Sequence, residues 1–146
     1  MPDAASNAAL NRVLIELGRS LLQYVGESWP WSPSSDEDTQ RRLDALVERQ
    51  RAEAERVFNV LSRREWNVDL GGYPTEYTDL HYLALHHLLR LLLESEARVL
   101  DEIERAAREC ANDPPAAALL TEAAAEQRAI VTELRKLCRS TSGAAA

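Results

Sequence analysis

The chain has 146 residues and a mass of 16.4 kDa, which suits one domain and leaves little room for a second. Its formal net charge of −7 disfavours nucleic-acid binding, because a surplus of carboxylates repels phosphates. Hydrophobic residues make up 45% and charged residues 28%, the balance of a folded globular chain rather than a disordered one. Because Gly and Pro are few among many Ala, Leu, Glu and Arg, the composition predicts one all-α domain over residues 1–146.

Targeting and membrane segments are not expected. The first ten residues have neither a basic start nor an apolar run, so no signal peptide is predicted. The most apolar stretch, 80–93, contains three histidines and an arginine, which disfavours a membrane span. Cys110 and Cys138 lack metal-ligand spacing and a disulfide pattern, and we expect two free thiols in a cytoplasmic protein.

Four helices are predicted in chain order. In the first, over about residues 7–26, apolar side chains recur every three or four positions. The segment 28–35 contains two prolines and is expected to be a loop. The second helix covers about residues 36–65, and its acidic first turn suits the positive end of a helix dipole.

The third helix is predicted over about residues 76–110 and the fourth over about 115–139, with a disordered tail at 140–146. The short turn between them makes these two helices antiparallel neighbours. The connector before the third helix has about ten residues and could reach roughly 33 Å when extended. It therefore allows a long crossover along the bundle, although a simple up-and-down connection is also compatible with this length.

Polar residues that fall on the apolar stripes are candidates for a metal site. Because four-helix bundles hold metal sites in their interior, we predict that mid-helix carboxylates and one imidazole converge there. Such ligands suit iron, manganese or zinc. The predicted ligands are Glu53, His87, Glu94 and Glu126. The alternative is that each glutamate is a boundary residue paired with a nearby arginine, that His87 is an ordinary core or interface residue, and that no metal is bound.

The loop around Trp29 and Trp31 is rich in aromatic side chains. It could form an oligomer or partner surface, or it could simply cap one end of the bundle with two indoles. We expect a homo-oligomer, a dimer or larger, with this loop as one candidate surface for a protein partner. No membrane contact is expected.

The order of several short motifs resembles that of the ferritin-like superfamily, in particular that of bacterioferritin and rubrerythrin-type bundles. Gln23-Tyr24 closes the first helix, and Asp69-Leu70-Gly71-Gly72-Tyr73-Pro74 stands where those proteins open a long crossover. Leu91-Leu92-Leu93-Glu94 is followed, at about the family's separation, by Glu126. The resemblance covers roughly residues 8–138 and implies a ferritin-like four-helix bundle with a long crossover between its second and third helices.

The resemblance also implies a di-iron site, but the match to its ligands is incomplete. The family pattern has a Glu on the first helix, Glu-x-x-His on the second, a Glu on the third and Glu-x-x-His on the fourth. Here Leu17 stands at the first position, Glu53 is followed three residues later by Arg56, and Glu126 by Ala129. Both family histidines are missing, so full iron oxidation, which needs two irons with open positions, is not expected.

Two hypotheses about function follow. The first is a ferritin-like protein with a degenerate or single-metal carboxylate site that binds iron or another divalent metal. The second is a non-enzymatic bundle that has lost its site and acts through oligomerisation or by binding a protein. A DNA-protecting relative is disfavoured by the net charge of −7. No enzymatic activity is assigned.

Overall fold

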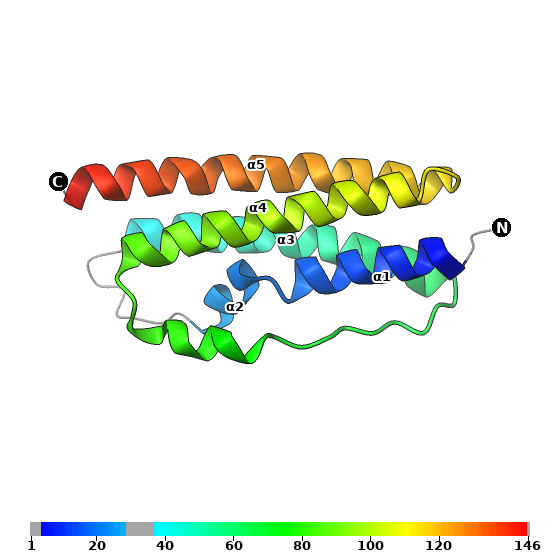
Figure 1. Cartoon of the computed structure of the whole chain (residues 1–146), viewed down its shortest axis with the longest axis horizontal. Coiled ribbons are helices and arrows are strands. Elements are labelled where there is room, and N and C mark those ends of the chain that lie inside the picture. Colours follow the sequence, from blue (N-terminus) through cyan, green and yellow to red (C-terminus); the bar gives the residue numbers. More distant parts are fainter. Residues whose placement is uncertain (1–3, 29–36, 146) are drawn as a thin grey trace.

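The computed structural model describes residues 4–28 and 37–145, with only the backbone of residues 81, 82 and 141–145. Its elements are α1 (Ala4–Gly18), α2 (Leu21–Glu27), α3 (Glu37–Arg63), the 3-10 helix η1 (Thr75–Tyr82), α4 (Leu85–Glu109) and α5 (Pro114–Ala145). Every regular element in this part of the chain is helical, which confirms the predicted all-α bundle (Figure 1).

The crossover is the feature that defines the topology. In Figure 1, the segment between α3 and α4 returns along the whole length of the bundle, so α3 and α4 run in the same direction. The α4 and α5 helices are antiparallel neighbours joined by a short turn, as predicted. No described helix is long and apolar enough to cross a membrane.

The first predicted helix is broken into two. After α1 ends at Gly18, Ser20 adopts an extended conformation and its side chain accepts a hydrogen bond from the backbone N–H of Gln23, which begins α2. A serine in this conformation is a strong N-cap, and a preceding glycine weakens the helix. The apolar spacing continues across the break, which is why the periodicity predicted one helix.

The third predicted helix begins later than expected. Residues 75–82 form the 3-10 helix η1, and α4 starts only at Leu85 after an extended Ala84. Tyr77 and Leu80, which extend the apolar stripe in the sequence, pack from η1 against residues of the bundle core. Their apolar spacing therefore reflects packing of the crossover rather than a first turn of α4.

The predicted disordered tail is also wrong, because α5 continues to Ala145. The last residues contain no proline and end in alanines, the best helix formers, so the one glycine at 143 does not end the helix. The Trp29–Trp31 loop, by contrast, lies outside the described residues.

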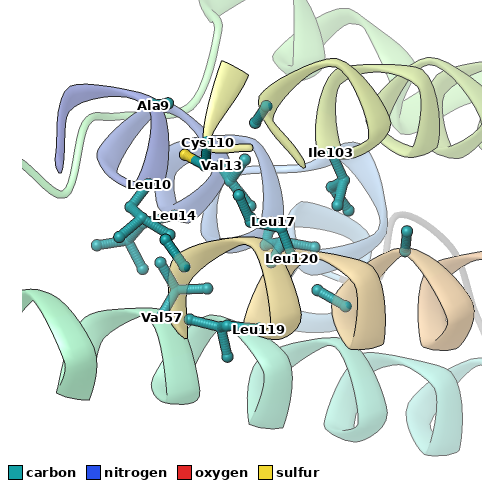
Figure 2. Packing of buried hydrophobic residues seen from close by; sticks show 14 of the residues in the cluster. Ala9, Leu10, Val13, Leu14, Leu17, Val57, Ile103, Cys110, Leu119 and Leu120 are labelled. Carbon is teal, nitrogen blue, oxygen red and sulfur yellow. The ribbon is translucent and has the colours of Figure 1, made fainter. Parts of the chain in front are cut away.

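The core consists of two apolar clusters at opposite ends of the bundle. One joins most of α1 to the C-terminal half of α3, the C-terminal half of α4 and the N-terminal half of α5; Figure 2 shows side chains such as Leu10, Val57 and Leu120 meeting there. The other joins α2 to the N-terminal halves of α3 and α4 and to the C-terminal half of α5. Its side chains include Leu22, Leu43, Leu88 and Leu134. Between the two clusters, one level of the bundle interior holds polar residues.

The crossover is fixed against α1 and α2 by polar and aromatic contacts. The Asn11 amide donates to the backbone carbonyl of Asp69 (2.9 Å) and accepts from its backbone N–H (3.0 Å). Gly71 has φ +65°, and a Cβ there would lie 2.8 Å from Ile15 Cγ2, so only glycine fits. The Tyr73 and Tyr77 rings lie 5.3 and 5.5 Å from the Tyr24 ring, between centroids.

Candidate functional site

A layer of buried polar side chains crosses the bundle between the two apolar clusters. The α3, α4 and α5 helices contribute to it at mid-length, and α2 contributes at its start. Each member is between 0 and 4% exposed. We call this set the polar layer; its members are Ser20, Gln23, Gln50, Glu96 and Gln127. Because buried polar groups are costly unless they are hydrogen-bonded, the contacts within the layer decide what it can do.

Glu96 provides the only carboxylate of the polar layer, and N–H groups surround it. Its Oε1 accepts from Gln50 Nε2 at 2.6 Å and from Gln127 Nε2 at 3.2 Å, and its Oε2 accepts from the backbone N–H of Leu22 at 3.3 Å. The break between α1 and α2 supplies this third donor, because the first N–H groups of a helix have no partner within it. The helix break at Ser20 therefore provides a backbone N–H donor for the Glu96 carboxylate.

Gln50 is the centre of the hydrogen-bond network. Its Oε1 accepts from Ser20 Oγ at 2.7 Å and from Gln23 Nε2 at 3.1 Å. Its Nε2 donates to Gln127 Oε1 at 3.0 Å, in addition to Glu96. Gln127 Nε2 also reaches the backbone carbonyl of Glu96 at 3.0 Å. The polar layer thus joins α2, α3, α4 and α5 through side chains that satisfy one another.

Burial raises the pKa of Glu96, and the hydrogen bonds from Gln50, Gln127 and Leu22 offset part of this effect. The direction follows from physics, because a carboxylate without water is disfavoured in its charged form unless donors or cations replace the solvent. No arginine or lysine forms an ion pair with Glu96 in the described part of the chain. The donors around this carboxylate are therefore neutral amides.

Two of the predicted metal ligands, Glu53 and Glu126, lie at the edge of the core and are paired with arginines. Arg49 Nε donates to Glu126 Oε1 at 2.5 Å, and Arg56 Nη1 lies 3.1 Å from Glu53 Oε2. The Glu53 side chain is 12% exposed and the Glu126 side chain 30% exposed. This is the arrangement of the alternative that the sequence left open, in which the glutamates are salt-bridged boundary residues.

The other two predicted ligands, His87 and Glu94, are exposed, so their predicted interior position is wrong. The buried face of α4 runs through Leu88, Leu92 and Glu96, and a shift of one or two residues turns a side chain by roughly 100–200° around the helix. Among residues 4–28 and 37–145, no group of three or more His, Cys, Asp and Glu side chains could hold a metal ion. The ligand role of these four residues stays a prediction.

Sequence reasoning overlooked Glu96 and Gln127, although a signal for both was present. Glu96 continues the spacing of Leu89, Leu92, Val99 and Ile103, and Gln127 that of Leu120, Ala123, Ile130 and Leu134. Gln50 likewise shares the spacing of Leu46, Ala54 and Val57. The likeness of Leu91–Glu94 to a family motif drew attention to a glutamate two residues away from the buried one.

The donor set of the polar layer does not fit the di-iron centre that the resemblance implies. Such a centre needs several carboxylates and two imidazoles, whereas the layer offers one carboxylate, three amides and one hydroxyl. The amide N–H groups of Gln50 and Gln127 point at the Glu96 carboxylate, where a cation would need oxygen or nitrogen lone pairs. No metal chemistry is therefore derived from these residues.

Comparison with known proteins agrees with the fold. A scan against protein families matches the ferritin-like domain over residues 7–144. No curated protein and no solved structure matched the chain. The match covers nearly every helix, including the crossover that makes α3 and α4 parallel. The chain belongs to the ferritin-like domain family.

Proposed function

We propose that this protein is a non-enzymatic, self-associating ferritin-like bundle in which the polar layer has taken the place of a metal centre. The observation that supports the loss of the metal centre is the hydrogen-bonding of Glu96 by Gln50, Gln127 and Leu22. A cation at this position would have to displace N–H donors and would leave them unsatisfied in the core, which is costly. The function then depends on the outer faces of the helices.

The outer face of α1 and α3 offers the best surface for a second copy of the chain. Two large hydrophobic residues of the described chain are exposed, Phe58 by 39% and Leu70 by 51%. Both line a groove of about 230 Å³ whose floor includes Leu14 and Ala54. Adjacent exposed apolar side chains over a shallow apolar groove are typical of protein interfaces.

Charges at the edge of this groove favour a second copy over an unrelated partner. Arg51 and Glu55 both line the groove and lie one helical turn apart on α3. When two α3 helices pack antiparallel about a two-fold axis, Arg51 of one copy meets Glu55 of the other. The only described bond of Arg51 is to Glu48 within the same helix, an exposed pair that exchanges partners at little cost.

Sedimentation velocity over a range of protein concentrations tests this proposal. We expect the wild-type chain to form a dimer or larger assembly and Phe58→Glu to shift it toward monomer, because a buried unpaired carboxylate opposes association. Asn59→Glu, which adds the same charge at the exposed neighbouring position, is the matched control and should leave the assembly unchanged. A wild-type chain that is monomeric at all concentrations would contradict the proposal.

A metal-binding function remains the competing proposal, and it makes a different prediction. Glu126 and Glu53 would have to leave Arg49 and Arg56, and Glu94 and His87 would have to turn inward from the surface. In that case, metal bound during expression with iron, manganese or zinc should disappear in Glu126→Ala and Glu94→Ala. The control is Glu133→Ala, which removes a carboxylate that pairs with Lys136 elsewhere on α5. This variant should retain the metal.

A further inference from the structure

A cleft of about 290 Å³ lies between the crossover and the bundle, beside the polar layer. Its walls come from α1, α4 and the segment 72–77 of the crossover. The volume falls at the lower end of the roughly 300–1,000 Å³ range typical of ligand pockets. Any small molecule bound in this cleft must therefore be compact.

Opposite charges face the cleft without neutralising one another. Glu16 on α1 and Arg98 on α4 both line it, and neither forms a hydrogen bond or ion pair with another described residue. Burial and the nearby Glu102 carboxylate raise the pKa of Glu16, and Arg98 offsets part of this increase. Glu102 is paired with Arg105 at 2.6 Å, whereas Glu16 and Arg98 are left without an ion-pair partner among the described residues.

The second arginine of the cleft is already engaged. Arg19 Nε donates to the backbone carbonyls of Leu70 and Gly71, each at 3.3 Å, and its guanidinium lies 5.1 Å from the centre of the Tyr73 ring. These contacts hold the crossover over the cleft. Arg98 is therefore the cation that remains available to a ligand.

Hydroxyl groups complete the lining. Ser95 and Tyr77 lie side by side at the cleft, and Ser20 lines it as well. Ser20 Oγ donates to Gln50 Oε1 at 2.7 Å, so one residue of the cleft belongs to the polar layer. A ligand bound here would touch the network that surrounds Glu96.

We propose that this cleft binds a compact zwitterion, a small amino acid whose carboxylate contacts Arg98 and whose ammonium group contacts Glu16. An anion alone would face the two carboxylates, and a cation alone would face the two guanidinium groups. A zwitterion satisfies both sides at once, and each charge opposes ligands that carry only the other sign.

Amide NMR titration of the whole chain tests the proposal with glycine, β-alanine and γ-aminobutyrate as probes, which differ in the separation of their charges. Acetate and ethylamine serve as single-charge controls. We expect at least one amino acid to shift the amides of Tyr77, Ser95 and Ser20 with a millimolar or lower dissociation constant, about tenfold tighter than either control, a difference of about 1.4 kcal/mol. If none of the amino acids binds, or if acetate binds equally well, the proposal is wrong.

Two variants locate the binding in the cleft. Arg98→Ala and Glu16→Gln should each weaken amino-acid binding at least tenfold, while Arg90→Ala and Asp101→Asn, which change exposed charges on α4 outside the cleft, should not. All four positions are exposed, so circular dichroism should show unchanged helix content and confirm that the variants fold. Equal binding in wild type and in both cleft variants would overturn the proposed site.

Discussion

The polar layer and the apolar clusters that flank it share α3, α4 and α5, but they contribute differently to the folded state. The clusters bury leucine, valine and isoleucine side chains, which contribute most of the stability and would tolerate other apolar residues of similar volume. The polar layer adds little net stability, but its bonds form only when α2, α3, α4 and α5 are correctly aligned. The apolar clusters therefore supply stability, and the polar layer, at a separate level of the same bundle, fixes how the helices are aligned.

The largest effect is expected in the apolar clusters. Leu120 is fully buried among residues of α1, α3 and α4, so Leu120→Ala should lower the free energy of unfolding by about 2–5 kcal/mol, through lost burial and the cavity left behind. Arg135→Ala, at an exposed position of α5, is the control and should change it far less. Urea denaturation measures both, and similar losses in the two variants would contradict this assignment of the core.

A smaller effect is expected in the polar layer. Gln50→Ala removes the residue that bonds Ser20, Gln23, Glu96 and Gln127, and it should cost about 1–3 kcal/mol because buried partners are left unsatisfied. Gln40→Ala, earlier on α3, is the control. An unfolding free energy equal to that of the wild type would show that water enters and replaces the lost bonds.

The smallest effect is a difference in pH dependence. Because the pKa of Glu96 is raised in the folded state, its contribution to stability is complete below the ordinary range of a glutamate and is lost as the pH rises through the raised pKa. The stability of the wild type relative to Glu96→Gln should therefore fall across that interval. Glu94→Gln, at an exposed position, should show no such trend.

The pKa of Asp113 is shifted in the opposite direction to that of Glu96. Hydrogen bonds from Arg64, at 2.8 and 2.9 Å, lower the pKa of Asp113, so its contribution is present above the ordinary range of an aspartate and is lost as the pH falls. Stability curves of wild type and Asp113→Asn should thus separate as the pH rises from the acid range. Curves that separate only toward low pH would contradict this sign.

The sequence predicted the helices well because a 3.6-residue apolar period survives wherever a helix packs on a core. It could not predict the break at Ser20, since Leu17, Leu21 and Val25 keep the same spacing on both sides of it. The predicted third helix also included residues 76–82, which belong to η1. Tyr77 and Leu80 keep the apolar spacing of α4 although they pack on the core from this separate element. Periodicity reports burial and does not identify which element is buried.

The candidate site was harder to predict than the fold. The sequence predicts an interior carboxylate at Glu94, whereas the buried one is Glu96, and a difference of two residues separates the surface of α4 from the core. Gln50 shares the apolar spacing of α3, but this spacing does not identify its amide as the partner of a buried carboxylate. The pairing of Gln50, Glu96 and Gln127 depends on the alignment of three helices, which no single stripe reveals.

The central claim is that Glu96 is satisfied by the N–H groups of the protein rather than by a cation. Metal content per chain, measured after expression with added iron, manganese and zinc, tests it together with melting curves recorded with and without a chelator. The account predicts no stoichiometric metal and identical melting temperatures. One or more metal ions per chain, removed by the chelator with a clear fall in melting temperature, would contradict it.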